Sequence, residues 1–271
     1  MWVDMKKWLI FLALLAPVAA AAQRTTEVSG RASVGVEYKI VKGLHLQVEE
    51  EIRSGSGFAS LGSFRTTAGL SYKPAKFIKF GAGYTLINPY KSSASAFNYP
   101  RHRVWADLTG YLPLGDFQFF LKERLQLTHR TGDFNAYQST PDALGLKSRI
   151  GVKYKRFKAF EPSLSFEVRT ALNDPWGEVT SGTLQTTKGG KTYYPYQFSG
   201  YTHVYNNRYR FNLGADIRLS KHHHLEPYVM LDFCSDYEID TNSDGTRLYT
   251  ATTAWNEITG FVMGLSYTLS F

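Results

Sequence analysis

Charged side chains recur at alternate positions along most of this 271-residue chain, which carries 31 Lys and Arg against 23 Asp and Glu. Alternate residues of a β-strand share one face, so in a closed barrel this charged face would line the interior. The candidates for the lining are Arg65, Lys79, Arg101, Arg103, Lys122, Arg124, Lys147, Arg149, Arg210, Glu49, Glu51, Asp107, Glu167 and Asp216. Rings of Arg and Lys favour anions, which predicts a narrow porin-like passage for small anionic solutes. The favoured interpretation of the same pattern is a structural barrel, whose long side chains pair across the lumen and plug it.

Histidines near the ends of predicted strands raise a second possibility, a hydrolase or deacylase acting on lipid or lipopolysaccharide at the barrel rim. His129 and His203 are the two candidates, with Asp133, Ser139, Ser199 and Asp174 in neighbouring loops. Such a site needs a nucleophile, a base and an orienting group within hydrogen-bond reach. No local motif joins a serine to either histidine, so no catalytic residue is assigned and a role without catalysis is favoured.

Two strings resemble metal sites. His222 to His224 fall in a short turn, where alternate residues point in opposite directions, so at most two of them could share an ion. Asp240 to Gly245 match the first half of a calcium-binding loop, but the twelfth position, which should be Glu, is Ala251. We therefore expect no metal and no cofactor.

The elements that would position these residues are strands, because apolar residues fill the remaining alternate positions from Val28 onward. Leu44, Leu46 and Val48, for example, alternate with His45, Gln47 and Glu49. The pattern recurs over 64–73, 78–86, 102–112, 117–130, 144–154, 160–172, 208–219, 225–237 and 259–271. Helical periodicity is absent at any convincing length, so the chain is predicted to be all-β.

Connections of alternating length join these strands. Short turns are expected at 42–43, 73–76, 113–116, 155–158 and 221–224, and longer polar stretches at 54–62, 88–100, 131–142, 173–200 and 238–254. Short turns at one end and long loops at the other are typical of an outer-membrane barrel. The sequence thus predicts a transmembrane up-and-down antiparallel β-barrel.

The number of strands follows from the directions of the first and the last strand. Eleven strands are clear, and the first and the last of them would run in the same direction. Bacterial single-chain barrels have an even number of strands, so Gln23 to Gly30 is the candidate for one more crossing. We expect about twelve strands, with ten as the alternative.

The longest insertion, 173–200, contains Trp176, Tyr193, Tyr194, Tyr196 and Phe198. Exposed aromatic residues there could bind a sugar or a partner. The favoured interpretation is that the segment folds inward or extends the strands above the bilayer, with Tyr193 to Phe198 entering the next strand.

Both ends of the chain indicate export. Residues 1–22 have a basic start at Lys6 and Lys7, a short apolar region and Ala20 to Ala22 as a cleavage site, which predicts a signal peptide before a barrel over 23–271. The last strand places Phe261, Met263, Leu265, Tyr267, Leu269 and Phe271 on one face. An apolar last strand ending in Phe looks like the assembly signal of outer-membrane barrels. The expected location is the outer membrane of a Gram-negative bacterium, with membrane lipid and the barrel-assembly machinery as partners.

Composition agrees with this reading. Aromatic residues make up 15% of the chain, there is a single Cys, and the net charge is +8, while the mean hydropathy is only -0.28. These values exclude a disordered chain, a disulfide scaffold and a multi-helix membrane protein. The positive charge is spread over strand positions, so no nucleic-acid site is expected. A protein partner stays open.

The segments 49–53, 64–66, 69–73 and 80–84, together with Met5 to Lys7 and the terminal Phe271, resemble an uncharacterised Bacteroidota-type outer-membrane barrel family, domain of unknown function 2490. The resemblance extends over the whole mature chain. It implies a fold and a location, and no reaction, since that family carries no assigned catalytic residues.

Overall fold

The computed structural model describes residues 25–132, 134–179, 186–188, 191–243 and 248–271, which form thirteen strands and two short 3-10 helices. The strands are β1 (Thr25–Val41), β2 (Leu44–Ser54), β3 (Leu61–Ala75), β4 (Ile78–Lys91), β5 (Ala96–Phe97), β6 (Arg101–Leu114), β7 (Phe117–Arg130), β8 (Asp142–Tyr154), β9 (Phe160–Val179), β10 (Thr186–Lys188), β11 (Lys191–Arg218), β12 (His223–Ser243) and β13 (Leu248–Ser270). The 3-10 helices η2 (Ser56–Phe58) and η3 (Ser92–Ala94) lie in connections. Among the described residues, no helix has the length and apolar character needed to cross a membrane. The expected signal peptide, residues 1–22, falls outside the described part.

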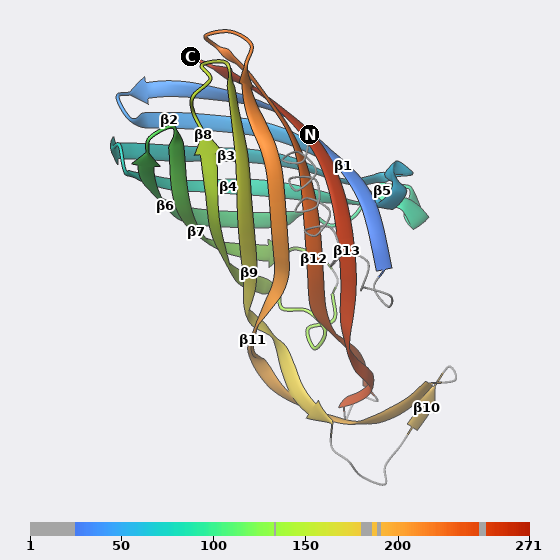
Figure 1. The fold of residues 1–271 in the computed structure, drawn as a ribbon. Helices are drawn as coiled ribbons and strands as arrows, with labels where there is room; N and C mark the ends of the chain where they lie inside the picture. Colours follow the sequence, from blue (N-terminus) through green and yellow to red (C-terminus); the bar gives the residue numbers. More distant parts are fainter. Residues whose placement is uncertain (1–24, 133, 180–185, 189–190, 244–247) are drawn as a thin grey trace, which may run out of the picture.

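The sheet closes on itself. Its path runs through twelve strands, β10-β11-β12-β13-β1-β2-β3-β4-β6-β7-β8-β9, and β9 pairs back with β11 (Figure 1). The three-residue β10 pairs with β11, and β5 pairs only with β4, so the eleven long strands form the wall of the barrel. The predicted all-β barrel of about twelve strands is confirmed.

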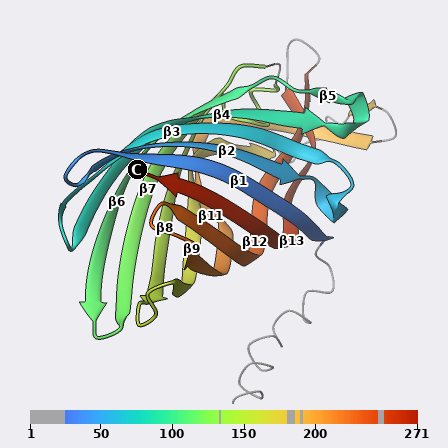
Figure 2. The same cartoon turned by 90° about the horizontal axis from the view of Figure 1, so that it is seen from above.

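The barrel seam joins the first strand to the last. β1 pairs with β13 in parallel, from Thr25 opposite Ile258 to Glu37 opposite Ser270, and the other pairings are antiparallel. Figure 2 shows β1 beside β13 when the barrel is viewed from above. The prediction that Gln23 to Gly30 make a separate crossing is wrong. β1 is one continuous strand of 17 residues, because the alternation runs through Gly30 without a turn. The parallel seam between β1 and β13 allows an odd number of long strands to close the barrel.

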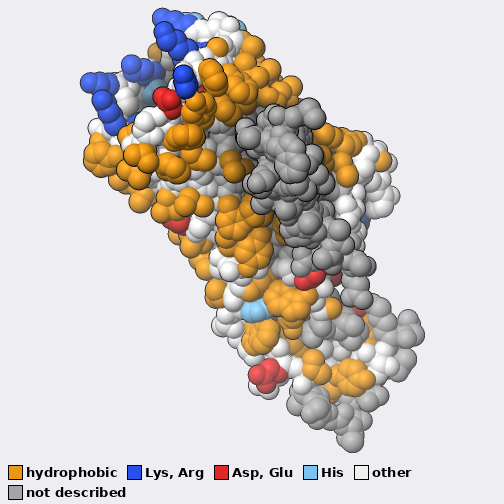
Figure 3. Space-filling view, in the orientation of Figure 1, with side chains coloured by type: hydrophobic (Ala, Val, Ile, Leu, Met, Phe, Trp, Pro, Cys, Tyr) orange, Lys and Arg blue, Asp and Glu red, His pale blue; other side chains and the backbone are white. Residues whose placement is uncertain are grey.

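The wall has apolar residues outside and polar residues inside, the reverse of a water-soluble core. Val34, Ile150 and Leu164 expose 59%, 57% and 52% of their surface, whereas Asp107, Glu167 and Arg210 are buried. Apolar side chains therefore coat the outer surface (Figure 3). The period-2 pattern of each strand accounts for this division, since successive side chains point to opposite faces.

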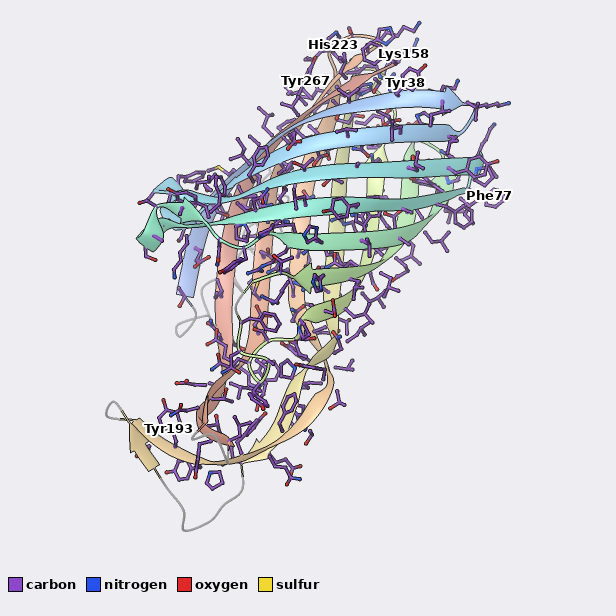
Figure 4. The ribbon with its side chains drawn as sticks, turned by 180° about the vertical axis from the view of Figure 1, so that it is seen from behind. Tyr38, Phe77, Lys158, Tyr193, His223 and Tyr267 are labelled. Atoms are coloured by element: carbon purple, nitrogen blue, oxygen red, sulfur yellow. The ribbon has the colours of Figure 1, made fainter. Side chains whose placement is uncertain are left out.

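The two ends of the barrel differ. At the turn end, tight connections join β1 to β2, β3 to β4, β6 to β7, β8 to β9 and β11 to β12. β9 and β11 pair over their whole shared length, from Phe160 opposite Ile217 at the turn end to Val179 opposite Tyr196, and their outer parts form a paired ribbon at the loop end. Figure 4 shows Tyr193 at the tip of this ribbon, far from Phe77 and Lys158 at the turn end. The favoured interpretation of 173–200 allowed an inward fold or an extension of the strands, and the extension agrees with this ribbon.

Candidate functional site

A cavity of about 1050 Å³ occupies the lumen and reaches the loop end. Its wall includes residues of the connection between β7 and β8, such as Ser139 and Thr140, and the outer part of β12 from Asp236 to Asp240. Ten basic residues line it: Arg53, Arg65, Arg101, Arg103, Arg124, Arg130, Lys147, Arg169, Arg208 and Arg210. Six acidic residues line it: Glu49, Glu51, Asp174, Asp236, Glu238 and Asp240. The lining is therefore basic on balance.

Four of these basic residues form a continuous row across adjacent strands, which we call the basic belt. Arg124 on β7 lies opposite Lys147 on β8, Lys147 lies opposite Arg169 on β9, and Arg169 lies opposite Arg208 on β11. Neighbouring strands are about 4.8 Å apart, and like charges directly opposite each other destabilise a sheet. The register of the barrel thus places four positive charges side by side in the lumen.

In the described part of the chain, only the two ends of the basic belt have a carboxylate oxygen within 4.0 Å. Arg124 donates hydrogen bonds from Nε and Nη2 to Oδ2 of Asp107, at 2.9 and 2.5 Å. Arg208 Nε lies 3.4 Å from Asp232 Oδ1 and donates to Cys234 Sγ at 3.0 Å. In the described part of the chain, neither Lys147 nor Arg169 has a carboxylate oxygen within 4.0 Å, and Nε of Arg169 is buried without a hydrogen-bond partner.

A second group of arginines lies nearer the loop end. Arg101 on β6 and Arg130 on β7 are directly opposite each other, and both line the cavity. Nε of Arg130 is buried without a hydrogen-bond partner. Arg103 donates from Nε to Oγ1 of Thr128 across the same ladder, at 2.9 Å. These donors can receive the oxygens of an anion in addition to those of the basic belt.

On the turn side of the basic belt, the next row of side chains is paired. Glu167 accepts hydrogen bonds from Arg149, at 2.9 Å from Nε, and lies 3.4 Å from Nη1 of Arg210. Arg210 also donates to Asp232 at 2.7 Å. Nζ of Lys122 lies 3.0 Å from Oδ2 of Asp107. We call these six residues the ion-pair floor: Arg149, Glu167, Arg210, Asp232, Lys122 and Asp107. Their side chains pair across neighbouring strands on the turn side of the cavity.

Trp105 was not singled out from the sequence, although it lines the cavity. Its ring lies 4.0 Å from the guanidinium of Arg124, and two glycines make room for it. Gly69 lies opposite Gly83, and Gly83 lies opposite Trp105. A Cβ atom on Gly83 would lie 2.5 Å from the Trp105 ring and 2.6 Å from the carbonyl oxygen of Ala68. Facing glycines on adjacent strands are the signal that could have indicated a large inward ring.

The predicted lining residues fall into three sets, and Arg210 belongs to the first two of them. Those that line the cavity are Arg65, Arg101, Arg103, Arg124, Lys147, Arg210, Glu49 and Glu51. Lys122, Arg149, Asp107 and Glu167 lie in the ion-pair floor instead. Lys79 lies toward the turn end, opposite Thr109, and Asp216 lies 3.1 Å from Nδ1 of His224. Glu238 and Asp240, on the acidic side of the cavity, were missed because 238–254 was expected to be a loop and is mostly strand, while Asp236 lay in a predicted strand and was not selected.

The two candidate catalytic histidines lie in different settings. Nδ1 of His129 is 2.7 Å from Oδ1 of Asp142, and the described residues include no serine hydrogen-bonded to either histidine. His203 packs in an aromatic cluster with Trp176, Tyr205 and Tyr237, at ring-centroid distances of 4.5, 4.5 and 5.1 Å. Burial lowers the pKa of His203, an effect that Asp174 opposes. Asp133 falls outside the described residues.

The strings that resemble metal sites are dispersed. The three histidines contact different groups: Nδ1 of His222 contacts the carbonyl of Ser270, His223 contacts the Tyr267 hydroxyl, and His224 contacts Asp216. Asp240 to Ser243 belong to β12, while Asp244 and Gly245 fall outside the described residues. Within the described part of the chain, no three His, Cys, Asp or Glu side chains are arranged to hold a metal ion.

The last strand closes the seam at the turn end. The amide of Phe271 donates to the carbonyl of Glu37 at 2.9 Å, and its carbonyl accepts from the amide of Lys39 at 3.0 Å. Met263 and Leu265 expose 44% and 46% of their surface on the outer face. The terminal residues of the expected assembly signal are therefore held by β1.

Comparison with known proteins identifies a family. No curated protein matches the chain. A solved structure, outer-membrane expressed OmpT of Vibrio cholerae, is similar with a TM-score of 0.33 and 8% sequence identity. The similar region covers 79% of this chain, which spans 61% of the length of that protein. The family model described as "Protein of unknown function (DUF2490)" matches residues 32–186, more than half of the chain. The attribution to Bacteroidota stays a prediction, and the chain belongs to the DUF2490 family.

Proposed function

We propose that this protein is an outer-membrane β-barrel that admits small anionic solutes into its lumen from the loop end. The observation that carries the proposal is the basic belt. Its two central residues, Lys147 and Arg169, line a cavity of about 1050 Å³ and have no carboxylate within 4.0 Å in the described part of the chain.

The outer wall supports a location in a membrane. Large apolar residues on every long strand are exposed, among them Val34, Leu121, Ile150, Leu213 and Leu265. A soluble monomer rarely exposes a continuous apolar patch larger than a few hundred Å². The long strands have 11 residues or more, enough for the ~9–11 residues that a tilted spanning strand requires.

The lumen supports a preference for anions. Like charges in directly opposed positions repel each other, and a bound anion would turn that repulsion into attraction. The unpartnered Nε atoms of Arg130 and Arg169 supply donors that an oxyanion can accept from. Because arginine forms paired hydrogen bonds with carboxylate and phosphate, these are the ligand groups that the lining fits.

The orientation follows from the two ends. Outer-membrane barrels have short periplasmic turns and long extracellular loops. We therefore assign the loop end, with the open side of the cavity, to the cell exterior. The face from Phe261 to Phe271 is assigned as the signal read by the assembly machinery. The ion-pair floor then separates the cavity from the periplasmic side, so complete passage requires its side chains to move.

Titration calorimetry of the refolded protein with inorganic phosphate tests the proposal. We expect phosphate to bind, and we expect the double variant Lys147→Gln, Arg169→Gln to bind it at least about tenfold more weakly, because charged hydrogen bonds are lost. Lys91→Gln, at the end of β4 and outside the cavity lining, is the matched control. Equal binding by all three proteins, or no binding by the unmodified protein, would contradict the proposal.

A further inference from the structure

The tips of the turns at the turn end carry exposed positive charge that the lumen does not use. Six exposed basic residues define what we call the turn rim: Lys42, Lys76, Lys155, Arg156, Lys158 and Lys221. They come from four of the five turns, and the fifth turn contributes the exposed Asp116. Lys155 has a distant partner in Glu161, at 3.9 Å. The other five residues of the rim have no carboxylate within 4.0 Å in the described part of the chain.

Exposed apolar side chains alternate with these charges in the same turns. Phe77 follows Lys76 and is 64% exposed, and Phe157 lies between Arg156 and Lys158 and is 52% exposed. Leu219 and Leu114 expose 59% and 65% of their surface in two further turns. Figure 3 shows Lys and Arg side chains gathered at this end, directly beside apolar ones.

A further lysine, Lys73, lies next to the turn rim. Burial, together with the charges of Lys155 and Lys79, lowers the pKa of Lys73 at the end of β3. Its ammonium group lies 4.8 Å from the centre of the Tyr111 ring. No acidic side chain contributes to this shift, so the charges that act on Lys73 are those of neighbouring lysines.

This combination of charge and apolar surface selects the kind of partner. An acidic protein or polymer in water would satisfy the lysines and leave Phe77, Phe157 and Leu219 exposed. A lipid leaflet satisfies both sets, since phosphates accept from the ammonium groups while the apolar side chains enter the acyl region. Net negative headgroups add Coulomb attraction that zwitterionic headgroups lack.

We infer that the turn rim binds the headgroups of anionic phospholipids in the leaflet at the turn end. This inference rests on the membrane location in the proposed function and does not depend on anion binding in the lumen. Because the phosphates are contacted from several turns around the barrel, the lipids form a partial ring. Their affinity should fall as ionic strength rises, because salt screens exposed charges.

Spin-labelled lipids measure this preference in vesicles that contain the refolded full mature chain. Labelled phosphatidylglycerol and labelled phosphatidylcholine are compared in a phosphatidylcholine host. We expect the unmodified protein to associate preferentially with phosphatidylglycerol. The variant Lys42→Gln, Lys76→Gln, Lys158→Gln, Lys221→Gln should lose most of that preference, about fivefold for each charge that contacts a headgroup. Lys91→Gln at the loop end is the control and should retain it.

The outcomes separate this inference from the proposed function. Equal association of both lipids with the unmodified protein would overturn the assignment of the turn rim. An unchanged preference in the variant with four substitutions would overturn it as well. Phosphate binding in the lumen would be unaffected by either result. If no variant inserts into phosphatidylcholine vesicles, the membrane location fails, and this inference fails with it.

Discussion

Lys147 and Arg169 lie directly opposite each other in the ladder between β8 and β9, with both side chains lining the cavity. Arg124 and Arg208 flank them on the adjacent strands. A sheet that keeps four like charges in one row loses stability at each opposed pair. We interpret this loss of stability as a consequence of a site built to bind an anion, because an anion bound beside the four charges would offset their repulsion.

The first prediction concerns this repulsion. Arg169→Gln removes one member of two opposed like-charge pairs, those with Lys147 and Arg208. At low salt, we expect the free energy of unfolding to rise by about 0.2–1 kcal/mol for each relieved pair. The added stability from phosphate should shrink in the same variant. Urea unfolding in detergent micelles, with and without phosphate, measures both quantities. A loss of stability in the absence of phosphate would contradict this interpretation.

The second prediction concerns the ion-pair floor. Glu167 is buried between Arg149 and Arg210, so Glu167→Gln leaves two cations without their shared carboxylate. Breaking a buried pair on one side costs about 3–5 kcal/mol, and we expect a loss of stability of that order. The same change should increase ion current through the barrel, because the floor loses its cross-links. Glu50→Gln, on the outer face where Glu50 accepts a hydrogen bond from Thr66, serves as the control. An unchanged current in Glu167→Gln would show that the floor does not limit passage.

The third prediction tests the membrane location through depth. Leu125 lies near the middle of β7 and is 47% exposed, and Leu114 lies at the turn end and is 65% exposed. Arginine on the lipid face costs about 2–4 kcal/mol at the bilayer midplane and about 0–1 near the interface. In vesicles, Leu125→Arg should therefore destabilise the protein much more than Leu114→Arg. If water surrounded the wall, the depth of the substituted residue would not matter. Equal destabilisation by Leu125→Arg and Leu114→Arg would therefore argue against a bilayer around the wall.

The fourth prediction concerns pH. Burial lowers the pKa of His203 below its usual value of about 6.5. The unfolded chain then takes up a proton at a higher pH than the folded chain does. His203 therefore has no effect on stability above about pH 6.5, and stability is lost as the pH falls from there through the folded pKa. His203→Phe keeps an aromatic ring in the cluster and cannot titrate. The unfolding midpoint of the unmodified protein should fall faster than that of the variant over this range, and parallel curves would show that His203 is not the group responsible.

The sequence was sufficient for the architecture because each strand obeys a period of two. The inward direction of Arg124, Lys147 and Arg210 follows from alternation alone, and the structure agrees. The parallel seam was implied by an odd count of clear strands, yet a rule of even strand number favoured an extra crossing at Gln23 to Gly30. The structure closes the barrel without that crossing, because β1 pairs in parallel with the last strand, β13.

The composition of the basic belt was predictable, but its contiguity was not. Which residue of β8 faces Arg124 depends on the stagger between strands, and that stagger is set by turn geometry and barrel closure. The division between cavity and ion-pair floor depends in the same way on which carboxylates reach which arginines. Asp236, Glu238 and Asp240 do alternate, but the Asn, Ser and Gly residues that follow indicated a loop from residue 238 onward.

The most direct test of the central claim is the reversal potential of the refolded protein in a planar bilayer of phosphatidylcholine with a gradient of potassium chloride. We expect a small conductance whose reversal potential has the sign of chloride selectivity, and a shift toward zero in Lys147→Gln, Arg169→Gln while Lys91→Gln behaves as the unmodified protein does. A cation-selective current would contradict the account, and so would the absence of current in both the unmodified protein and Glu167→Gln.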